Sequence, residues 1–136
     1  MTSDAEPTNT VDESGNKTGL WREADDHGGT VIGEYRDGER HGTWRHLFTN
    51  GQRRAEGTYE RGRLDGDWVW YRRDGTLMQR GSFHDGEKHG RWQRWSTQGA
   101  LLDEGDFDRG KKVGVWVQYL PDGTIKKTTA HRVASA

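Results

Sequence analysis

Large aromatic side chains recur along this chain at fixed intervals, and short alternations of polar and apolar residues separated by glycine lie between them. One phrase, aromatic-x-x-Gly-x-x-x-Gly-x-Trp, occurs four times at a spacing of 24 residues. Its copies begin at Tyr35, Tyr59, Phe83 and Phe107 and end at Trp44, Trp68, Trp92 and Trp116. A fixed short period is typical of stacked supersecondary units, not of one globular core.

Each unit divides into two segments of strand length that end in turn-forming pairs. Asp74-Gly75 follows the segment around Trp68, and Asp85-Gly86 follows the segment around Phe83. Asp-Gly between aromatic or β-branched segments favours a β-hairpin, because glycine adopts positive φ without strain. We therefore predict an all-β fold, a single-layer twisted antiparallel meander of stacked hairpins, with about 4.5 units of 24 residues over residues 19–128.

Glycine also stands inside the second strand of each unit, at Gly57, Gly81 and Gly105. A glycine in a strand interior weakens the strand unless another group approaches the backbone closely. We expect the neighbouring Trp ring to lie across the bare backbone at these positions. The eight aromatic residues of the repeated phrase are accordingly the predicted structural core.

The two ends depart from the repeat. Residues 1–18 and 129–136 are rich in small and polar residues and are predicted to be disordered tails. Gly19 and Trp21 precede Gly42 and Trp44 by 23 residues, one fewer than the period, so this first unit is interpreted as a cap. The outer strands would be open edges, through which a homodimer is a further expectation.

The repeated phrase resembles the membrane occupation and recognition nexus (MORN) repeat. The longer form Gly-x-Trp-x-x-Tyr-x-x-x-Gly, from Gly66 through Trp68 and Tyr71 to Gly75, resembles the bacterial variant labelled YwqK-type antitoxin. The resemblance covers about 110 of the 136 residues. It implies an elongated sheet of hairpins and protein–protein contact, sometimes with membrane association. For the bacterial variant it implies an antitoxin or immunity protein that binds and occludes a partner.

Composition narrows the function classes. Only 29% of the residues are apolar and 32% are charged, but 7 Trp, 4 Tyr and 3 Phe supply large rings to bury. The net charge of −1 gives no strong basic field, so we expect no nucleic-acid partner. Without a signal-like start or a membrane-length apolar run, a cytoplasmic protein is expected. No catalytic set, metal-ligand set or cofactor motif stands out, so we expect no enzyme and no cofactor.

Positions that differ between units are the candidates for recognition. Two residues beyond each Trp, on the same predicted face, the column reads His46, Trp70, Arg94 and Gln118, with Trp95 nearby on the opposite face. Trp and Arg are common interface hot spots. The alternative interpretation is a half-solvated strand face that tolerates any soluble residue.

Charged turns form a second candidate along one edge. They include Glu87, Lys88, Arg109 and other residues of the turns after each aromatic position. The most basic end carries Arg109, Lys111, Lys112, Lys126 and Lys127. This end supports the alternative function, a peripheral membrane or structural scaffold that binds phospholipid headgroups or assembles through sheet edges.

Overall fold

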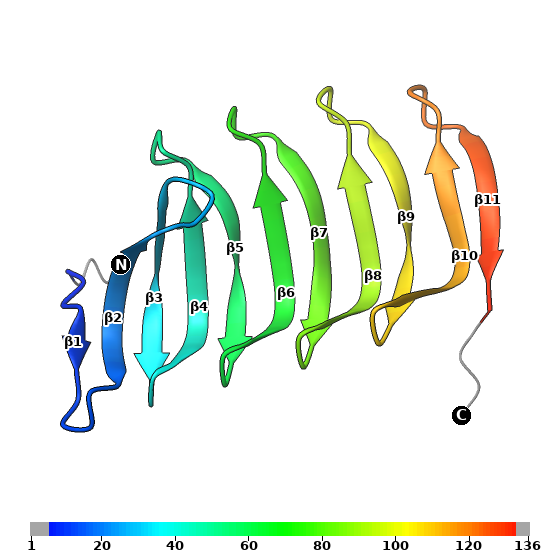
Figure 1. Ribbon diagram of the computed structural model, residues 1–136. Helices are drawn as coiled ribbons and strands as arrows, with labels where there is room; N and C mark the ends of the chain where they lie inside the picture. The colour runs from blue at the N-terminus through cyan, green and yellow to red at the C-terminus, as the bar shows by residue number, and fades with distance from the viewer. Residues whose placement is uncertain (1–5, 133–136) are drawn as a thin grey trace.

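The computed structural model describes residues 6–132, and the terminal parts of both predicted tails, residues 1–5 and 133–136, lie outside this range. The strands form one antiparallel sheet in sequence order, which confirms the predicted all-β meander (Figure 1). Residues 6–132 include no helix long and apolar enough to cross a membrane. The strands are β1 (Thr10–Val11), β2 (Lys17–Ala24), β3 (Thr30–Arg36), β4 (Glu39–Leu47), β5 (Arg53–Glu60), β6 (Arg63–Tyr71), β7 (Leu77–His84), β8 (Glu87–Trp95), β9 (Leu101–Asp108), β10 (Lys111–Tyr119) and β11 (Ile125–His131).

Tight turns fix the register at one end of the hairpins. Asp37 and Gly38 both have positive φ, 52° and 80°, and the equivalent pair Asp85 and Gly86 has 53° and 85°. Two consecutive residues with positive φ form the mirror-image turn that matches strand twist. The amide of each such glycine also donates to the preceding unit, as from Gly86 to the Leu64 carbonyl at 2.9 Å. The turns therefore connect neighbouring units as well as neighbouring strands.

Each repeat Trp lies across a glycine on the preceding strand, as predicted. A Cβ built on Gly57 would stand 2.0 Å from the Trp68 ring, and one on Gly81 would stand equally close to Trp92. The indole N–H of Trp68 donates to the Thr58 carbonyl at 2.9 Å, next to that glycine. The close approach requires the absence of a side chain, which explains a glycine in mid-strand.

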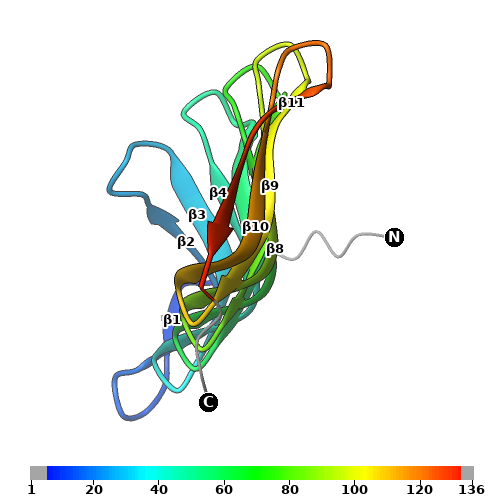
Figure 2. The same cartoon turned by 90° about the vertical axis from the view of Figure 1, so that its right-hand side faces the viewer.

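One face of the sheet, here called the aromatic face, carries the core. Edge-to-face ring contacts run along it: Tyr35 to Trp44 at 5.1 Å between centroids, and Trp44 to Tyr59 at 6.0 Å. Trp44 is 0% exposed, whereas Trp116, nearer the end of the sheet, is half-buried. Of the other predicted core residues, Tyr35, Trp68 and Trp92 are buried, and Tyr59, Phe83 and Phe107 are half-buried. The sheet is bent along its strands and twisted from β2 to β11 (Figure 2).

The first edge of the sheet begins inside the segment that the sequence analysis assigned to a disordered tail. The Asn9 side-chain amide donates to the Arg22 carbonyl at 3.1 Å and accepts from the Arg22 amide at 2.9 Å. The Trp21 indole donates to the Thr10 carbonyl at 2.9 Å. Residues 6–18 therefore belong to the sheet's edge, because Asn9 supplies the two hydrogen bonds that a strand partner would make.

The last strand, β11, also enters a predicted tail, since it ends at His131. Thr129 pairs with Trp116, in the register position that Gly57, Gly81 and Gly105 take opposite the other tryptophans. A side chain thus occupies the place where a following Trp would lie. His131 stands at the repeat's aromatic position and contacts the Trp116 ring at 6.4 Å between centroids.

Candidate functional site

Cations cover most of the tryptophan rings on the aromatic face. The covering residue stands four positions before each Trp, where its side chain reaches the ring of its own strand. The distances to the ring centroids are 4.7 Å for Lys17 over Trp21, 4.4 Å for Arg40 over Trp44, 4.8 Å for Lys88 over Trp92 and 4.6 Å for Lys112 over Trp116. Such cation–π contacts stabilise the cation and shield the ring from solvent.

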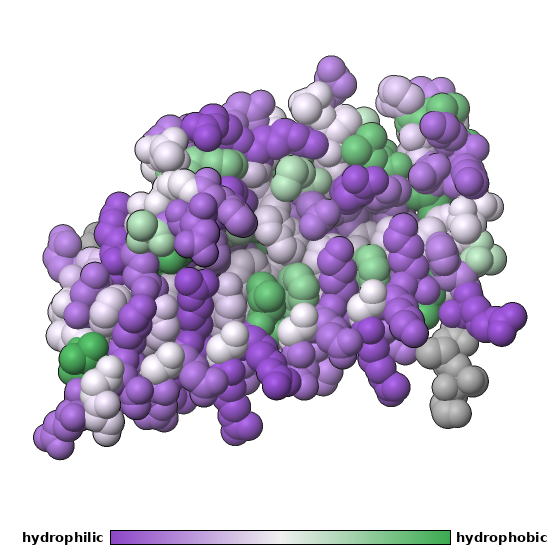
Figure 3. Space-filling view, viewed as in Figure 1, coloured by the Kyte–Doolittle hydropathy of each residue, from purple (hydrophilic) through white to green (hydrophobic). Residues whose placement is uncertain are grey.

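The central unit lacks this cation. Leu64 takes the position on β6, pairs with Tyr59 and is half-buried. Two residues beyond Trp68, Trp70 stacks on that ring at 6.0 Å and approaches Trp92 at 5.5 Å. Figure 3 shows hydrophobic atoms gathered over the lower parts of β6 and β7, with hydrophilic side chains over β4 and β8. We call Tyr59, Leu64, Trp68, Trp70 and Phe83 the central aromatic patch.

The predicted column lies on the aromatic face, but its members have different roles. His46 is an internal residue, since its side chain is only 16% exposed and its Nδ1 lies 3.5 Å from the Asp25 carboxylate. Asp25 also pairs with Arg54, and so ties the loop after β2 to β5. Burial, followed by the charges of Arg40 and His27, lowers the pKa of His46 to about 4. His46 is therefore neutral near pH 7 although a carboxylate lies beside it, because that carboxylate is already paired with a guanidinium.

Arg94, the third member of the column, also forms an ion pair within the sheet. Its Nε donates to the buried carboxylate of Asp103 at 3.0 Å, and this hydrogen bond raises the pKa of Arg94. Beside the pair lies a hollow of about 280 Å³ between Lys88 and Lys112, with Trp92 on its floor. Gln118, the last member, is exposed on β10.

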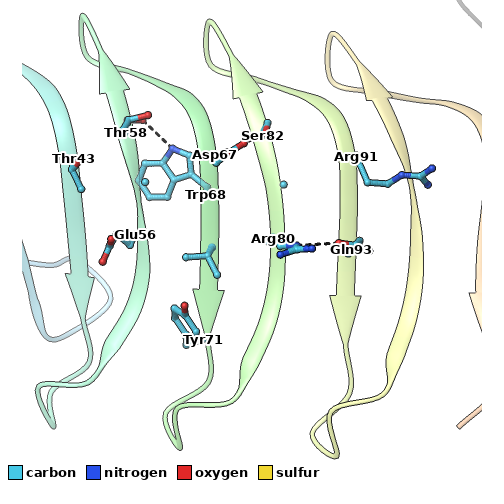
Figure 4. Close-up of a pocket in the computed structure, with 13 residues that line it drawn as sticks. Thr43, Glu56, Thr58, Asp67, Trp68, Tyr71, Arg80, Ser82, Arg91 and Gln93 are labelled. Carbon is cyan, nitrogen blue, oxygen red and sulfur yellow. Dashed lines mark hydrogen bonds between the residues drawn. The ribbon is translucent and has the colours of Figure 1, made fainter. Parts of the chain in front are cut away.

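Trp95 lies on the opposite face, as expected, where the Arg80 guanidinium covers its ring at 5.5 Å. This second face, here called the polar face, forms an open groove of about 650 Å³ (Figure 4). Its lining includes the polar residues Thr58, Asp67, Arg80, Ser82 and Gln93 as well as Trp68, Val69 and Tyr71. Its polar groups bond to one another: Arg80 Nε donates to Gln93 at 3.0 Å, and Ser82 pairs with Asp67. The groove is wide and internally satisfied, so it presents few free groups to a ligand.

Some of the charged turn residues pair with one another. Arg63 lies 2.8 Å from Asp85, and the imidazole of His84 lies 3.8 Å from Asp65. The rings of His84 and His89 are 6.0 Å apart between centroids. Within residues 6–132, no three potential metal-binding side chains converge.

The two repeats that surround the central aromatic patch also carry a family signature. Residues 40–61 and 64–85 match the MORN repeat variant. The matched segments contain Arg40, Tyr59, Leu64, Trp68 and Phe83, so they include one tryptophan with a cation over its ring and one without.

Structural and curated comparisons extend little beyond this match. A chain in the crystal structure of the GtfA/B complex bound to UDP and GlcNAc is similar at 16% identity and a TM-score of 0.38. The similarity covers 66% of this chain and 22% of that chain. No functionally curated protein shows significant sequence similarity.

The role of the position four residues before each Trp was not predicted from the sequence. Read down the units, that position holds Arg40, Leu64, Lys88 and Lys112. A comparison of the units position by position contains this signal. Its meaning depends on the ring contacts, which only the folded sheet shows.

Proposed function

We propose that this protein is a non-catalytic interaction repeat that binds a partner protein through the aromatic face. The observation that carries the proposal is the central aromatic patch, where Leu64 replaces the covering cation and Trp70 adds a second ring. Large aromatic side chains in preformed surroundings are the residues that dominate binding energy at interfaces. Trp70 packs against Trp68 and Trp92, so little side-chain freedom is lost on binding.

Within this function, we propose that the protein acts as an antitoxin or immunity-type protein that occludes its partner. The support is the resemblance to the bacterial MORN variant, together with a surface whose aromatic rings already pack against one another. Occlusion requires no chemistry from the binder, only a preformed surface that covers the partner's working site.

Affinity capture from lysate of the source cells, at physiological salt, tests the proposed binding face. The bait is compared with its Leu64→Lys and Trp70→Ala variants and with Gln93→Ala on the polar face as the matched control. We expect one stoichiometric partner with the parent and the control, and its loss with both patch variants. Arg94→Ala is a poor probe, because it leaves the buried Asp103 carboxylate without its guanidinium. Equal capture by all four proteins would place the interface elsewhere.

A second candidate function, peripheral membrane binding, has one observation in its favour. The last units expose Val115 at 58%, Leu120 at 40% and Ile125 at 60%, close in sequence to Lys126 and Lys127. Exposed apolar residues beside cations are typical of surfaces that bind anionic lipid. Cosedimentation with phosphatidylserine vesicles, lost in Ile125→Glu and at high salt, would support this function. The homodimer through edge strands stays a prediction, and sizing of the same sample tests it.

A further inference from the structure

Three of the cations on the aromatic face form no salt bridge with another residue among residues 6–132. Lys17 pairs with Glu23 and Arg94 with Asp103. In contrast, no carboxylate of the described residues lies within 4.0 Å of Arg40, Lys88 or Lys112. The free charge that these residues add to the face is positive, so an acidic partner complements it.

These cations and Leu64 form a regular ladder. They occupy one repeat position on the alternate strands β4, β6, β8 and β10, and each pairs with the aromatic residue of the preceding strand. Since neighbouring strands lie about 4.8 Å apart, successive positions are separated by about 9.6 Å. Across the sheet the ladder reads cation, leucine, cation, cation.

This spacing fits one backbone conformation of a crossing peptide. A polyproline II segment rises about 3.1 Å per residue with three residues per turn, so every third side chain projects on one side at about 9.3 Å. In a β-strand, side chains three apart point to opposite sides. In an α-helix, about 9.6 Å corresponds to between six and seven residues, which is not a whole number of turns. Aromatic-lined grooves are a common receptor for polyproline II segments.

We propose that the partner presents an extended acidic segment of the pattern acidic-x-x-apolar-x-x-acidic-x-x-acidic, which crosses the strands of the aromatic face. The apolar side chain lies on Leu64 and Trp70, and the carboxylates meet Arg40, Lys88 and Lys112. The hollow of about 280 Å³ beside Lys88 and Lys112 gives room for an acidic side chain. This inference rests on the proposed function and specifies the chemistry of its partner.

Synthetic fluorescent peptides test the spacing. The probe Glu-Pro-Pro-Leu-Pro-Pro-Glu-Pro-Pro-Glu and its reversed sequence are compared with an isomer of equal composition in which the acidic residues and leucine are adjacent. Anisotropy should show about tenfold tighter binding by the probe in one of the two directions than by the isomer. Equal binding of probe and isomer, or no binding of either, would overturn the inference.

A charge exchange separates recognition from folding. Leu64→Lys installs the residue found at this position in the Lys88 and Lys112 units, so the variant retains the fold. It should lose about tenfold in affinity for the leucine probe and gain for the peptide with Glu in place of Leu. Lys88→Leu should show the opposite preference at the peptide position that Lys88 contacts, because a leucine there favours a peptide with Leu in place of Glu. A Leu64→Lys protein that prefers the leucine probe as before would overturn the inference.

The outcomes of these experiments distinguish the acidic-segment inference from the proposed interaction function on which it rests. If the patch variants lose the captured partner but the peptides do not discriminate spacing, the interaction function stands and the acidic-segment inference fails. If phosphatidylserine vesicles bind through Lys88 and the probe peptide does not compete, the ladder serves lipid and the inference fails as well.

Discussion

The unit around Trp44 and the unit around Trp68 share one scaffold and differ, among other positions, at two on the aromatic face. Both place a Trp ring across a glycine, with a Cβ distance of 2.1 Å at Gly33 and 2.0 Å at Gly57. In the first unit Arg40 covers the ring and bonds to the Tyr59 hydroxyl at 3.2 Å, and His46 is buried against the loop. In the second unit the same positions hold Leu64 and Trp70, and Trp70 packs against Trp68, Phe83 and Trp92. The same two positions thus stabilise one unit and leave the other with an apolar surface.

The largest loss of stability should come from removing a fully buried ring of the shared scaffold. Trp44→Ala should lose about 4 kcal/mol of unfolding free energy, because the ring is fully buried and neither neighbouring strand can fill the space. Trp116→Ala should lose less, since that ring is half-buried and near the last strand. Urea denaturation measures both losses, and equal losses would contradict a core that is more tightly packed around Trp44 than around Trp116.

Filling the glycine position should cost about 3 kcal/mol in either unit. Gly33→Ala and Gly57→Ala each place a methyl group inside the volume of an indole ring, which must shift. Matching losses would show that the two units are equivalent in their scaffold. Thr129→Ala, at the same repeat position beyond the last Trp, is the control and should change stability by less than about 0.5 kcal/mol.

Acid should destabilise the first unit through His46. Its pKa is lowered to about 4 in the folded protein, so between about pH 6.5 and 4 the unfolded chain binds the proton that the folded chain excludes. The contribution is complete above about pH 6.5 and is lost as the pH falls through 4, on the order of 3 kcal/mol in all. The groups facing His46 are Asp25, which also holds Arg54, together with the charges of Arg40 and His27.

Denaturation curves at pH 7 and pH 4.5 for the parent and His46→Gln measure this effect. The variant should show a smaller difference between the two pH values. An unchanged difference would mean that other groups cause the acid sensitivity.

The smallest expected change in stability, at the position four residues before each Trp, separates the two units most clearly. Leu64→Lys should change the unfolding free energy by less than about 0.5 kcal/mol, because it exchanges a half-buried leucine for the cation used elsewhere. Arg40→Leu should cost about 1 kcal/mol, since it removes a hydrogen bond to Tyr59 and the cation over Trp44. Thermal melts of the two variants measure these losses. A larger loss for Leu64→Lys than for Arg40→Leu would refute the distinction between the units.

The features that could be predicted from the sequence are those that every repeat unit shares. The hairpins, the shared face of each Trp and the residue two beyond it, and the Gly–Trp packing depend on contacts that every unit makes, so the period reveals them. The roles of His46 and Arg94 did not follow, because their partners Asp25 and Asp103 come from a loop and from a neighbouring strand. The ordered edge before residue 18 was also missed, since the bonds from Asn9 and Trp21 and the short β1–β2 pairing lie outside the repeat pattern.

Thr129 gives the array a defined length. A unit can be inserted wherever a strand-interior glycine leaves room for the indole ring of the next unit. Each insertion would extend the sheet by about 9.6 Å. After β11 no such place exists, because a threonine side chain stands where the next ring would rest. The number of repeat positions on the aromatic face, and with it the length of segment that the face can span, is therefore set by Gly105, the last strand-interior glycine on which an indole ring lies.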